Sequence, residues 1–275
     1  MSLTHPRLPN NSIAATLLVL SLILCGGGLM NWHKDWMFIA NYRDLERTGR
    51  NPTNAFRPPR PEVIRRREKI ALEQTVSSPV SIAASDKTPV ISRIPTSEPV
   101  VFITIDDGIT KNGDAADYMA DRELPITAFL TLQAINNDYD YFGDLAKDGT
   151  SIQNHTVNHP NLPKHPYDSQ KNEICSTSDT LEGKYGKRPK LFRPPYGEYN
   201  DDTLRAAAAC GIKATIMWSV VVQNGALNYQ REPGLKPGDI ILMHYKPELK
   251  NDLEATVRSI REQGYKIGQL EDWVQ

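Results

Sequence analysis

The chain contains 275 residues with a formal net charge of -1, and 24% of its residues are charged. This length suits one or two domains, and the balanced charge excludes a general nucleic-acid-binding protein, which would carry a strong basic excess. The apolar content of 39% is slightly low for a compact globule, so we expect a polar segment beside an ordinary folded domain.

An uncharged apolar run occupies residues 13–30. The run is about long enough to span a bilayer, and its most apolar part, residues 13–24, has about the length of a signal-peptide core. Trp32 and Trp36 follow it, where interfacial aromatic residues often lie. Because no small-x-small cleavage site is evident, we expect an uncleaved signal anchor within residues 1–40, with a cleaved signal peptide as the alternative. The rest of the chain would then be extracytoplasmic, either membrane-anchored or secreted.

Residues 41–98 are rich in proline, arginine, serine and threonine and show little apolar periodicity. A segment of this composition is typical of an extended, disordered, low-complexity linker. The pattern changes at Pro99, where continuous apolar runs begin, so we expect the folded domain to comprise residues 99–275.

Short β-prone runs alternate with helical patterns from Pro99 onward. Strands are predicted at residues 100–105, 126–130, 151–154, 191–193, 212–222, 239–244 and 265–267. Helices are predicted at residues 114–122, 140–147, 169–185, 201–210 and 249–263, several of them followed by glycine, which commonly ends a helix. Such alternation indicates parallel strands joined by helical crossovers. Some seven repetitions favour a barrel-like α/β closure over a short open sheet.

The cysteines do not have the C-x-x-C spacing of a thiolate zinc site. Cys175 and Cys210 fall on two different predicted helices, and the sequence cannot show that these helices approach. We expect two buried, unpaired thiols; a disulfide is the alternative if the domain is exported.

Ionisable residues follow two of the predicted strands directly, at the strand ends where functional groups gather in parallel βα folds. Asp106 and Asp107 follow the first strand, and two adjacent carboxylates there repel each other unless a cation is near. His155 and His159 follow the third strand, and histidines four apart can face one ion on a helical turn. Two imidazoles and one carboxylate, from Asp107, would leave open positions for water and substrate, which is typical of a catalytic metal site.

Two further clusters also follow strands. In Arg193-Pro194-Pro195-Tyr196-Gly197 the prolines stiffen the loop, so the Tyr196 N–H can point at a developing oxyanion and Arg193 can orient a carboxylate. His244 ends an apolar strand, where an ionisable group is costly without a task. Each cluster alone is also compatible with an ordinary turn or core residue.

Together the four clusters resemble the NodB-homology polysaccharide deacetylases, carbohydrate esterase family four. The resemblance covers about residues 98 to 275 and rests on motifs that occur in order: Thr104-Ile105-Asp106-Asp107-Gly108, His155-Thr156-Val157-Asn158-His159, Arg193-Pro194-Pro195-Tyr196-Gly197 and Leu242-Met243-His244. It implies a distorted (β/α)7-8 barrel and a divalent metal, zinc in the first place and cobalt as the alternative.

The resemblance also implies a role for each residue of these motifs. It gives Asp107, His155 and His159 as metal ligands, Asp106 as general base, His244 as general acid, Arg193 as support for the base, and the Tyr196 N–H as oxyanion donor. It places Tyr196, Trp218 and Leu242 at the substrate. The reaction implied is removal of acetyl from N-acetylhexosamine units of an acetylated polysaccharide or oligosaccharide such as peptidoglycan or chitin, by an enzyme that we expect to be a monomer.

The chain departs from the family at its fourth motif, Trp218-Ser219-Val220-Val221-Val222-Gln223-Asn224-Gly225. Val221 stands where the family has an aspartate that orients the acid histidine, and Gly225 replaces a tryptophan that lines the groove. The change leaves two alternatives open beside the N-deacetylase: a glycan-binding relative without catalysis, and an esterase for O-acetyl groups of the xylan type.

Overall fold

The computed structural model describes residues 79–82 and 85–275. The apolar run at residues 13–30, which we predicted to be an anchor, lies outside these residues. Within them, no helix combines the length and the apolar character needed to cross a membrane.

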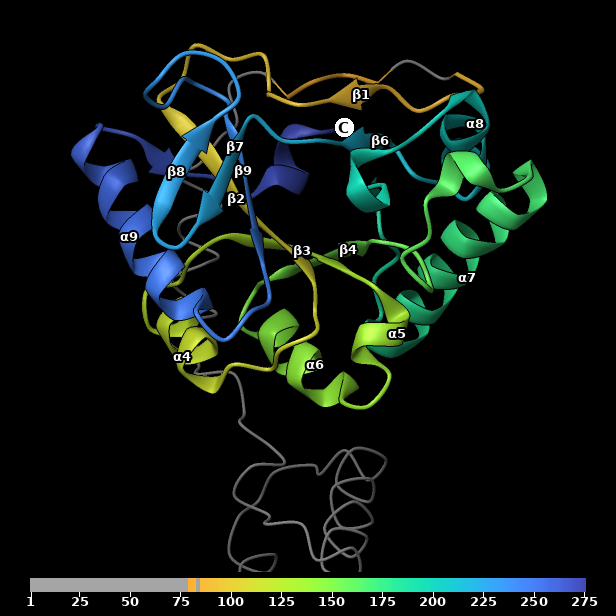
Figure 1. Ribbon diagram of the computed structural model, residues 1–275, viewed down its shortest axis with the longest axis horizontal. Helices are drawn as coiled ribbons and strands as arrows, with labels where there is room; N and C mark the ends of the chain where they lie inside the picture. The colour runs from red at the N-terminus through yellow and green to blue at the C-terminus, as the bar shows by residue number, and fades with distance from the viewer. Residues whose placement is uncertain (1–78, 83–84) are drawn as a thin grey trace, which may run out of the picture. The chain divides into compact units, whose positions relative to one another are not determined.

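One curled β-sheet forms the centre of this α/β domain, with helices around its outside (Figure 1). The strand order is β1-β6-β5-β4-β3-β2-β9-β7-β8, with β10 paired to β2. Every pairing is parallel except that of β7 with β8. The end strands of this order, β1 and β8, are not paired with each other. The predicted distorted barrel is therefore confirmed as a half-barrel that is not closed by strand pairing.

The strands are β1 (Val90–Ile91), β2 (Val100–Asp107), β3 (Ile126–Leu130), β4 (Ser151–Asn154), β5 (Leu191–Phe192), β6 (Ala214–Ile216), β7 (Val220–Gln223), β8 (Ala226–Tyr229), β9 (Ile240–His244) and β10 (Lys266–Ile267). The α-helices are α4 (Gly113–Asp121), α5 (Leu132–Ile135), α6 (Tyr139–Lys147), α7 (Tyr167–Tyr185), α8 (Asp201–Ala209) and α9 (Leu249–Glu262), and short 3-10 helices are η2 (Leu162–Lys164), η3 (Pro195–Gly197) and η4 (Leu270–Trp273).

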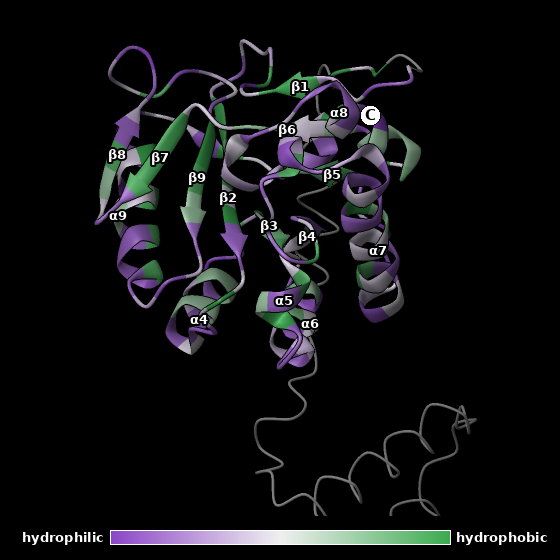
Figure 2. Cartoon of the chain, turned by 45° about the vertical axis from the view of Figure 1, so that its right-hand side comes forward, coloured by the Kyte–Doolittle hydropathy of each residue, from purple (hydrophilic) through white to green (hydrophobic). Residues whose placement is uncertain are grey.

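The central strand β2 explains where the polar site lies. Its residues up to Asp106 are buried, as expected for a parallel strand covered on both faces. It pairs with β3 on one side and β9 on the other. Figure 2 shows a hydrophobic strand that turns hydrophilic at its arrowhead, where Asp106 and Asp107 end it. The apolar part fixes the strand in the core and leaves these two carboxylates at the carboxyl edge.

The region 212–222, which we predicted as one strand, is two strands in different places. β6 pairs with β5 and β1, whereas β7 pairs with β9 and β8. The strand β8 was not predicted, although Asn224-Gly225 is a strong hairpin signal. Both residues have positive φ, 52° and 74°, as a type I′ turn requires. Asp252 of α9 supports the turn by accepting a 2.6 Å hydrogen bond from the Gly225 N–H.

The folded domain also begins earlier than Pro99, within the segment that we expected to be linker. β1 pairs with β6, and Arg93 donates a 2.7 Å hydrogen bond to Asp239. Ile94 is fully buried against Gly238, where a Cβ would lie 1.8 Å from the Ile94 carbonyl oxygen. Glycine is required at that close approach. The few apolar residues here are too sparse to give a sequence period, so only their contacts reveal the strand.

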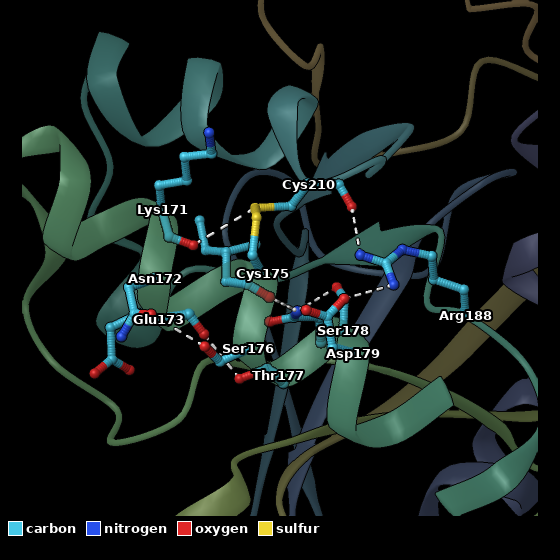
Figure 3. The surroundings of a disulfide bond; sticks show 12 residues. Lys171, Asn172, Glu173, Cys175, Ser176, Thr177, Ser178, Asp179, Arg188 and Cys210 are labelled. Carbon is cyan, nitrogen blue, oxygen red and sulfur yellow. Dashed lines mark hydrogen bonds and ion pairs between the residues drawn. A yellow bond between two sulfur atoms is a disulfide. The ribbon is translucent and has the colours of Figure 1, made fainter. Parts of the chain in front are cut away.

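Cys175 of α7 and Cys210, which follows α8, form a disulfide with a Cα–Cα distance of 4.9 Å (Figure 3). Our expectation of two unpaired thiols was therefore wrong. The pairing depends on α7 and α8 packing side by side, a contact between helices that neither helix's own sequence determines. The bond joins residues 35 positions apart.

Candidate metal centre and active site

Asp107, His155 and His159 come together at the carboxyl edge of the sheet. One potential ligand atom from each lies within 4.8 Å of the others. The Nε2 atoms of His155 and His159 are both 3.5 Å from Oδ1 of Asp107. A carboxylate and two imidazoles that converge in this way fit a divalent ion such as zinc, with coordination positions left for water and substrate.

The hydrogen bond of His155 determines which ring nitrogen faces the centre. Its Nδ1 lies 2.7 Å from the backbone carbonyl oxygen of Arg193. A carbonyl only accepts, so Nδ1 carries the proton in the neutral ring and Nε2 keeps its lone pair toward Asp107. His155 is thereby oriented as a ligand by the loop that also carries Tyr196.

The pKa values of the three residues reflect their proximity. Burial acts to raise the pKa of Asp107, but the hydrogen bond and charge of His155, with the charges of His244 and His159, outweigh it and lower that pKa. Burial acts to lower the pKa of His155, yet the Asp106 and Asp107 carboxylates raise it overall. Burial and the charge of His155 lower the pKa of His159. The negative charge of this centre favours a cation, and a bound metal ion would replace the proton on His155.

Asp106 takes a different partner from its neighbour Asp107. Its Oδ1 accepts a 2.7 Å hydrogen bond from Nη1 of Arg193, and both side chains are buried. The same Nη1 donates to Oγ1 of Thr104, and the other guanidinium nitrogens donate to the carbonyls of Ile216 and Met217. The guanidinium also lies over the Phe129 ring, 4.3 Å from its centroid. All three guanidinium nitrogens donate hydrogen bonds, so Arg193 is fixed in place. Arg193 in turn fixes Asp106 beside the triad, with Oδ2 3.8 Å from Nε2 of His155.

His244 stands next to Asp106 across the sheet, because β9 and β2 pair in the register His244↔Asp106. Leu242 is buried two residues earlier on β9. Val221 pairs with Leu242, so the altered fourth motif lies on the strand beside the one that carries His244. Side chains two apart on a strand share a face, which places Leu242 and His244 on one side of the sheet.

The Tyr196 loop lies beside the centre. Tyr196 is 64% exposed, and the centroid of its ring lies 4.6 Å from that of the His159 ring. Behind it, a Cβ on Gly197 would approach Met217 and Trp218 to 2.9 Å, so Trp218 packs against this loop. A hollow of about 320 Å³ adjoins the centre, lined by Asp107, His159 and the exposed Ile109 together with Thr131, Gln133 and Ala134.

Backbone strain is concentrated around the site. Asp107, Thr156, His159 and Tyr196 all have positive φ, between 56° and 79°. Non-glycine residues are uncommon in this region, and strained backbone gathers at functional sites, where the surrounding structure must hold it.

The structure thus places all the predicted polar site residues at one edge of the sheet. Sequence reasoning missed Glu173 of α7, which accepts three hydrogen bonds from the segment between the two histidines. No sequence signal separates it from a solvent-facing helical glutamate, because its partners lie about fifteen residues away.

Comparisons with known proteins agree with this fold. The polysaccharide deacetylase family model matches residues 93–215, which include the triad, Asp106, Arg193 and Tyr196. An uncharacterized protein of Streptomyces coelicolor is 38% identical over 68% of this chain and 77% of its own length. The chain belongs to the polysaccharide deacetylase family, carbohydrate esterase family 4.

Members of this family with different activities are among the similar proteins. A peptidoglycan N-acetylmuramic acid deacetylase of Bacillus subtilis is 25% identical, covering 64% of this chain and 72% of that protein. The fold is also that of a family 4 pseudoenzyme from Bacillus anthracis, with a TM-score of 0.60, 22% identity and coverage of 68% of this chain and 69% of that one. The proteins similar to this chain therefore include both an enzyme and a pseudoenzyme.

Proposed function

We propose that this chain is a metal-dependent deacetylase that removes acetyl from N-acetylhexosamine units of a cell-envelope or environmental polysaccharide of the peptidoglycan or chitin type. The observation that carries the proposal is the separation of two adjacent carboxylates: Asp107 faces two histidines, while Asp106 is held by Arg193. A site that only bound a cation would need Asp107 but not a second carboxylate fixed beside it.

Asp107, His155 and His159 would hold the ion, zinc in the first place and cobalt as the alternative. A divalent ion supplies Lewis acidity, which polarises the acetyl carbonyl and activates a water. Asp106 accepts the proton of the attacking water, and Arg193 keeps the carboxylate in position. The Tyr196 N–H donates to the oxyanion that develops on the carbonyl oxygen. His244 then gives a proton to the departing amine, which is a poor leaving group without it.

We further propose that the domain works outside the cytoplasm, secreted or tethered to a membrane by the apolar run at residues 13–30, and as a monomer. The Cys175–Cys210 disulfide supports this location, because disulfides persist mainly in oxidising compartments.

One observation favours two other candidate functions. Val221 offers no carboxylate on β7, the strand beside the one that carries His244, so the acid histidine has lost the partner implied by the family resemblance. A glycan-binding protein that retains the metal would tolerate this change. An O-acetyl esterase would tolerate it too, since an alkoxide leaves more readily than an amine.

Acetate release from N-acetylglucosamine oligomers and from acetylxylan, with and without a chelator, separates these functions. Release from the oligomers that a chelator abolishes and zinc or cobalt restores would support the N-deacetylase. Release from acetylxylan alone would show an esterase. Saturable glycan binding by metal-loaded protein, without acetate release from any substrate, would overturn the proposal in favour of the binding protein.

A further inference from the structure

The segment that runs from His155 to His159 is held in place by hydrogen bonds on two sides. The carbonyls of Thr156 and Val157 accept from the backbone N–H groups of Leu132 and Gln133, at 3.1 and 2.9 Å. The His155 carbonyl accepts from Oγ1 of Thr131 at 3.0 Å. The segment's carbonyls are thus tied to the turn that follows β3.

The backbone N–H groups of the same segment point elsewhere. The Thr156 N–H donates to the side chain of Asn154, and the His159 N–H donates to Oγ1 of Thr156, each at 3.0 Å. The His155 N–H donates to the Leu130 carbonyl at 3.1 Å. The N–H groups of Val157 and Asn158 both donate to Oε2 of Glu173 at 2.9 Å. The other carboxylate oxygen of Glu173 accepts a 2.7 Å hydrogen bond from the Asn158 amide.

Glu173 of α7 therefore binds this segment with both of its carboxylate oxygens. Its charge is met by N–H donors, and we find no ion pair to it among residues 79–82 and 85–275. Hydrogen bonds to a charged acceptor stabilise a structure more than hydrogen bonds between neutral groups. Such support matters here because Thr156 and His159 have the positive φ values of strained backbone.

The helix that presents Glu173 is itself fixed at the neighbouring residues. The Asn154 amide donates to the Ile174 carbonyl at 2.7 Å and to Oγ of Ser178 at 2.9 Å. Cys175, two residues after Glu173, forms the disulfide with Cys210 (Figure 3). Asn154 ends the strand that leads into His155, so the strand, the helix and the histidine segment form one connected unit.

We infer that Glu173 is a positioning residue for the metal centre: it holds the Val157–Asn158 turn so that His159 reaches the ion bound by Asp107 and His155. Glu173 is not a ligand, because its oxygens are occupied by the turn. This inference rests on the metal site of the proposed function but does not depend on the reaction. Groups that orient ligands in this way typically change metal affinity by about 10- to 100-fold when they are removed.

The test compares zinc binding by the wild-type chain, Glu173→Ala and Glu173→Gln, measured by competition with a chromophoric chelator. Alanine removes all three acceptor contacts, and we expect the zinc Kd to rise by about 10- to 100-fold. Glutamine keeps one oxygen for the two backbone N–H groups, so its Kd should rise less. Glu182→Gln is the matched control on the same helix, because the Glu182 side chain is exposed and pairs with Arg188, so this variant should leave the Kd unchanged.

Hydrogen exchange of the metal-free proteins gives a readout that needs neither metal nor substrate. The amides of Val157 and Asn158 should lose protection in Glu173→Ala, while those of α9 keep theirs. A wild-type Kd in Glu173→Ala, or unchanged exchange at both amides, would overturn the inference. Normal zinc binding by the wild type without acetate release would instead overturn the proposed function and leave Glu173 in its role. Thermal unfolding of each variant confirms that it is folded.

Discussion

Arg193 donates a hydrogen bond of 2.7 Å from Nη1 to Oδ1 of Asp106, and neither side chain is more than 4% exposed to solvent. Removing one partner of such a buried ion pair is strongly destabilising, because the other charge remains buried without a counter-charge. It explains how a second carboxylate can remain beside the negatively charged metal triad. The pair also separates the roles proposed for Asp106 and Asp107, which can be tested by substituting each.

Asp106→Asn should reduce acetate release by about 10²- to 10⁴-fold, the range for loss of a general base. Asparagine still offers an oxygen to Arg193, so the zinc Kd should be close to that of the wild type, while stability should fall because the buried guanidinium loses its counter-charge. Asp107→Asn is the matched variant, and it should weaken zinc binding as well as activity. Steady-state acetate release and zinc titration on both variants distinguish the two. Wild-type activity in Asp106→Asn would remove this residue from the mechanism.

Val221→Asp should increase the deacetylation rate on a working substrate. The new carboxylate would stand on β7, beside the strand that ends at His244, and would support the charged form of that histidine. Val221→Asn is the control, because it has a similar size without the charge. The rate constant kcat on the best N-acetylated oligomer is the measurement. No change, or a loss, in Val221→Asp would mean that His244 does not depend on such a partner here.

The disulfide should contribute measurably to stability. Closing a loop of 35 residues in the unfolded chain corresponds to about 3 to 4 kcal/mol of unfolding free energy. Urea unfolding of the Cys175→Ala/Cys210→Ala double variant should show a loss of this size. Reductant should destabilise the wild type by a similar amount and leave the double variant unaffected. If reductant has no effect on the wild type, the two thiols are not paired in solution.

Tyr245→Phe should leave stability at pH 7 unchanged or raise it by up to about 1 kcal/mol, because a buried polar group without a partner is unfavourable. The Tyr245 hydroxyl is buried and finds no hydrogen-bond partner within the described part of the chain. Tyr141→Phe is the contrasting variant, since the Tyr141 hydroxyl donates to the Asn112 carbonyl at 3.0 Å. It should lose about 1 kcal/mol. Thermal unfolding compares the two, and a clear loss in Tyr245→Phe would contradict the expectation.

The same two tyrosines predict how stability changes at alkaline pH. Burial raises the pKa of Tyr245 well above its ordinary value and that of Tyr141 to about 12. In the unfolded chain both lose their protons near pH 10, so the unfolded state binds fewer protons and stability falls as the pH rises above that value. Each phenylalanine variant should therefore lose less stability than the wild type between about pH 9 and about pH 11. Parallel stability profiles would show that neither tyrosine stays protonated in the fold.

Much of the architecture follows from local patterns. The strands predicted at residues 126–130 and 151–154 coincide with β3 and β4, and the helix predicted to stop at Gly186 does so, with φ of 73° at that glycine. These elements have strong apolar runs or clear end signals. Because parallel strands bring their carboxyl ends to one edge, the polar residues after each strand could also be expected to meet.

The sequence by itself therefore determined the alternating α/β organisation, the four polar clusters at strand ends, and the family resemblance that implies a role for each. Tertiary structure alone decided the rest: that β1 joins the sheet, that residues 212–222 divide between two strands, that Cys175 meets Cys210, and that Glu173 holds the histidine segment. The physical reason is range. A period or a turn signal is carried by neighbours in the chain, whereas these four contacts depend on how separate elements pack.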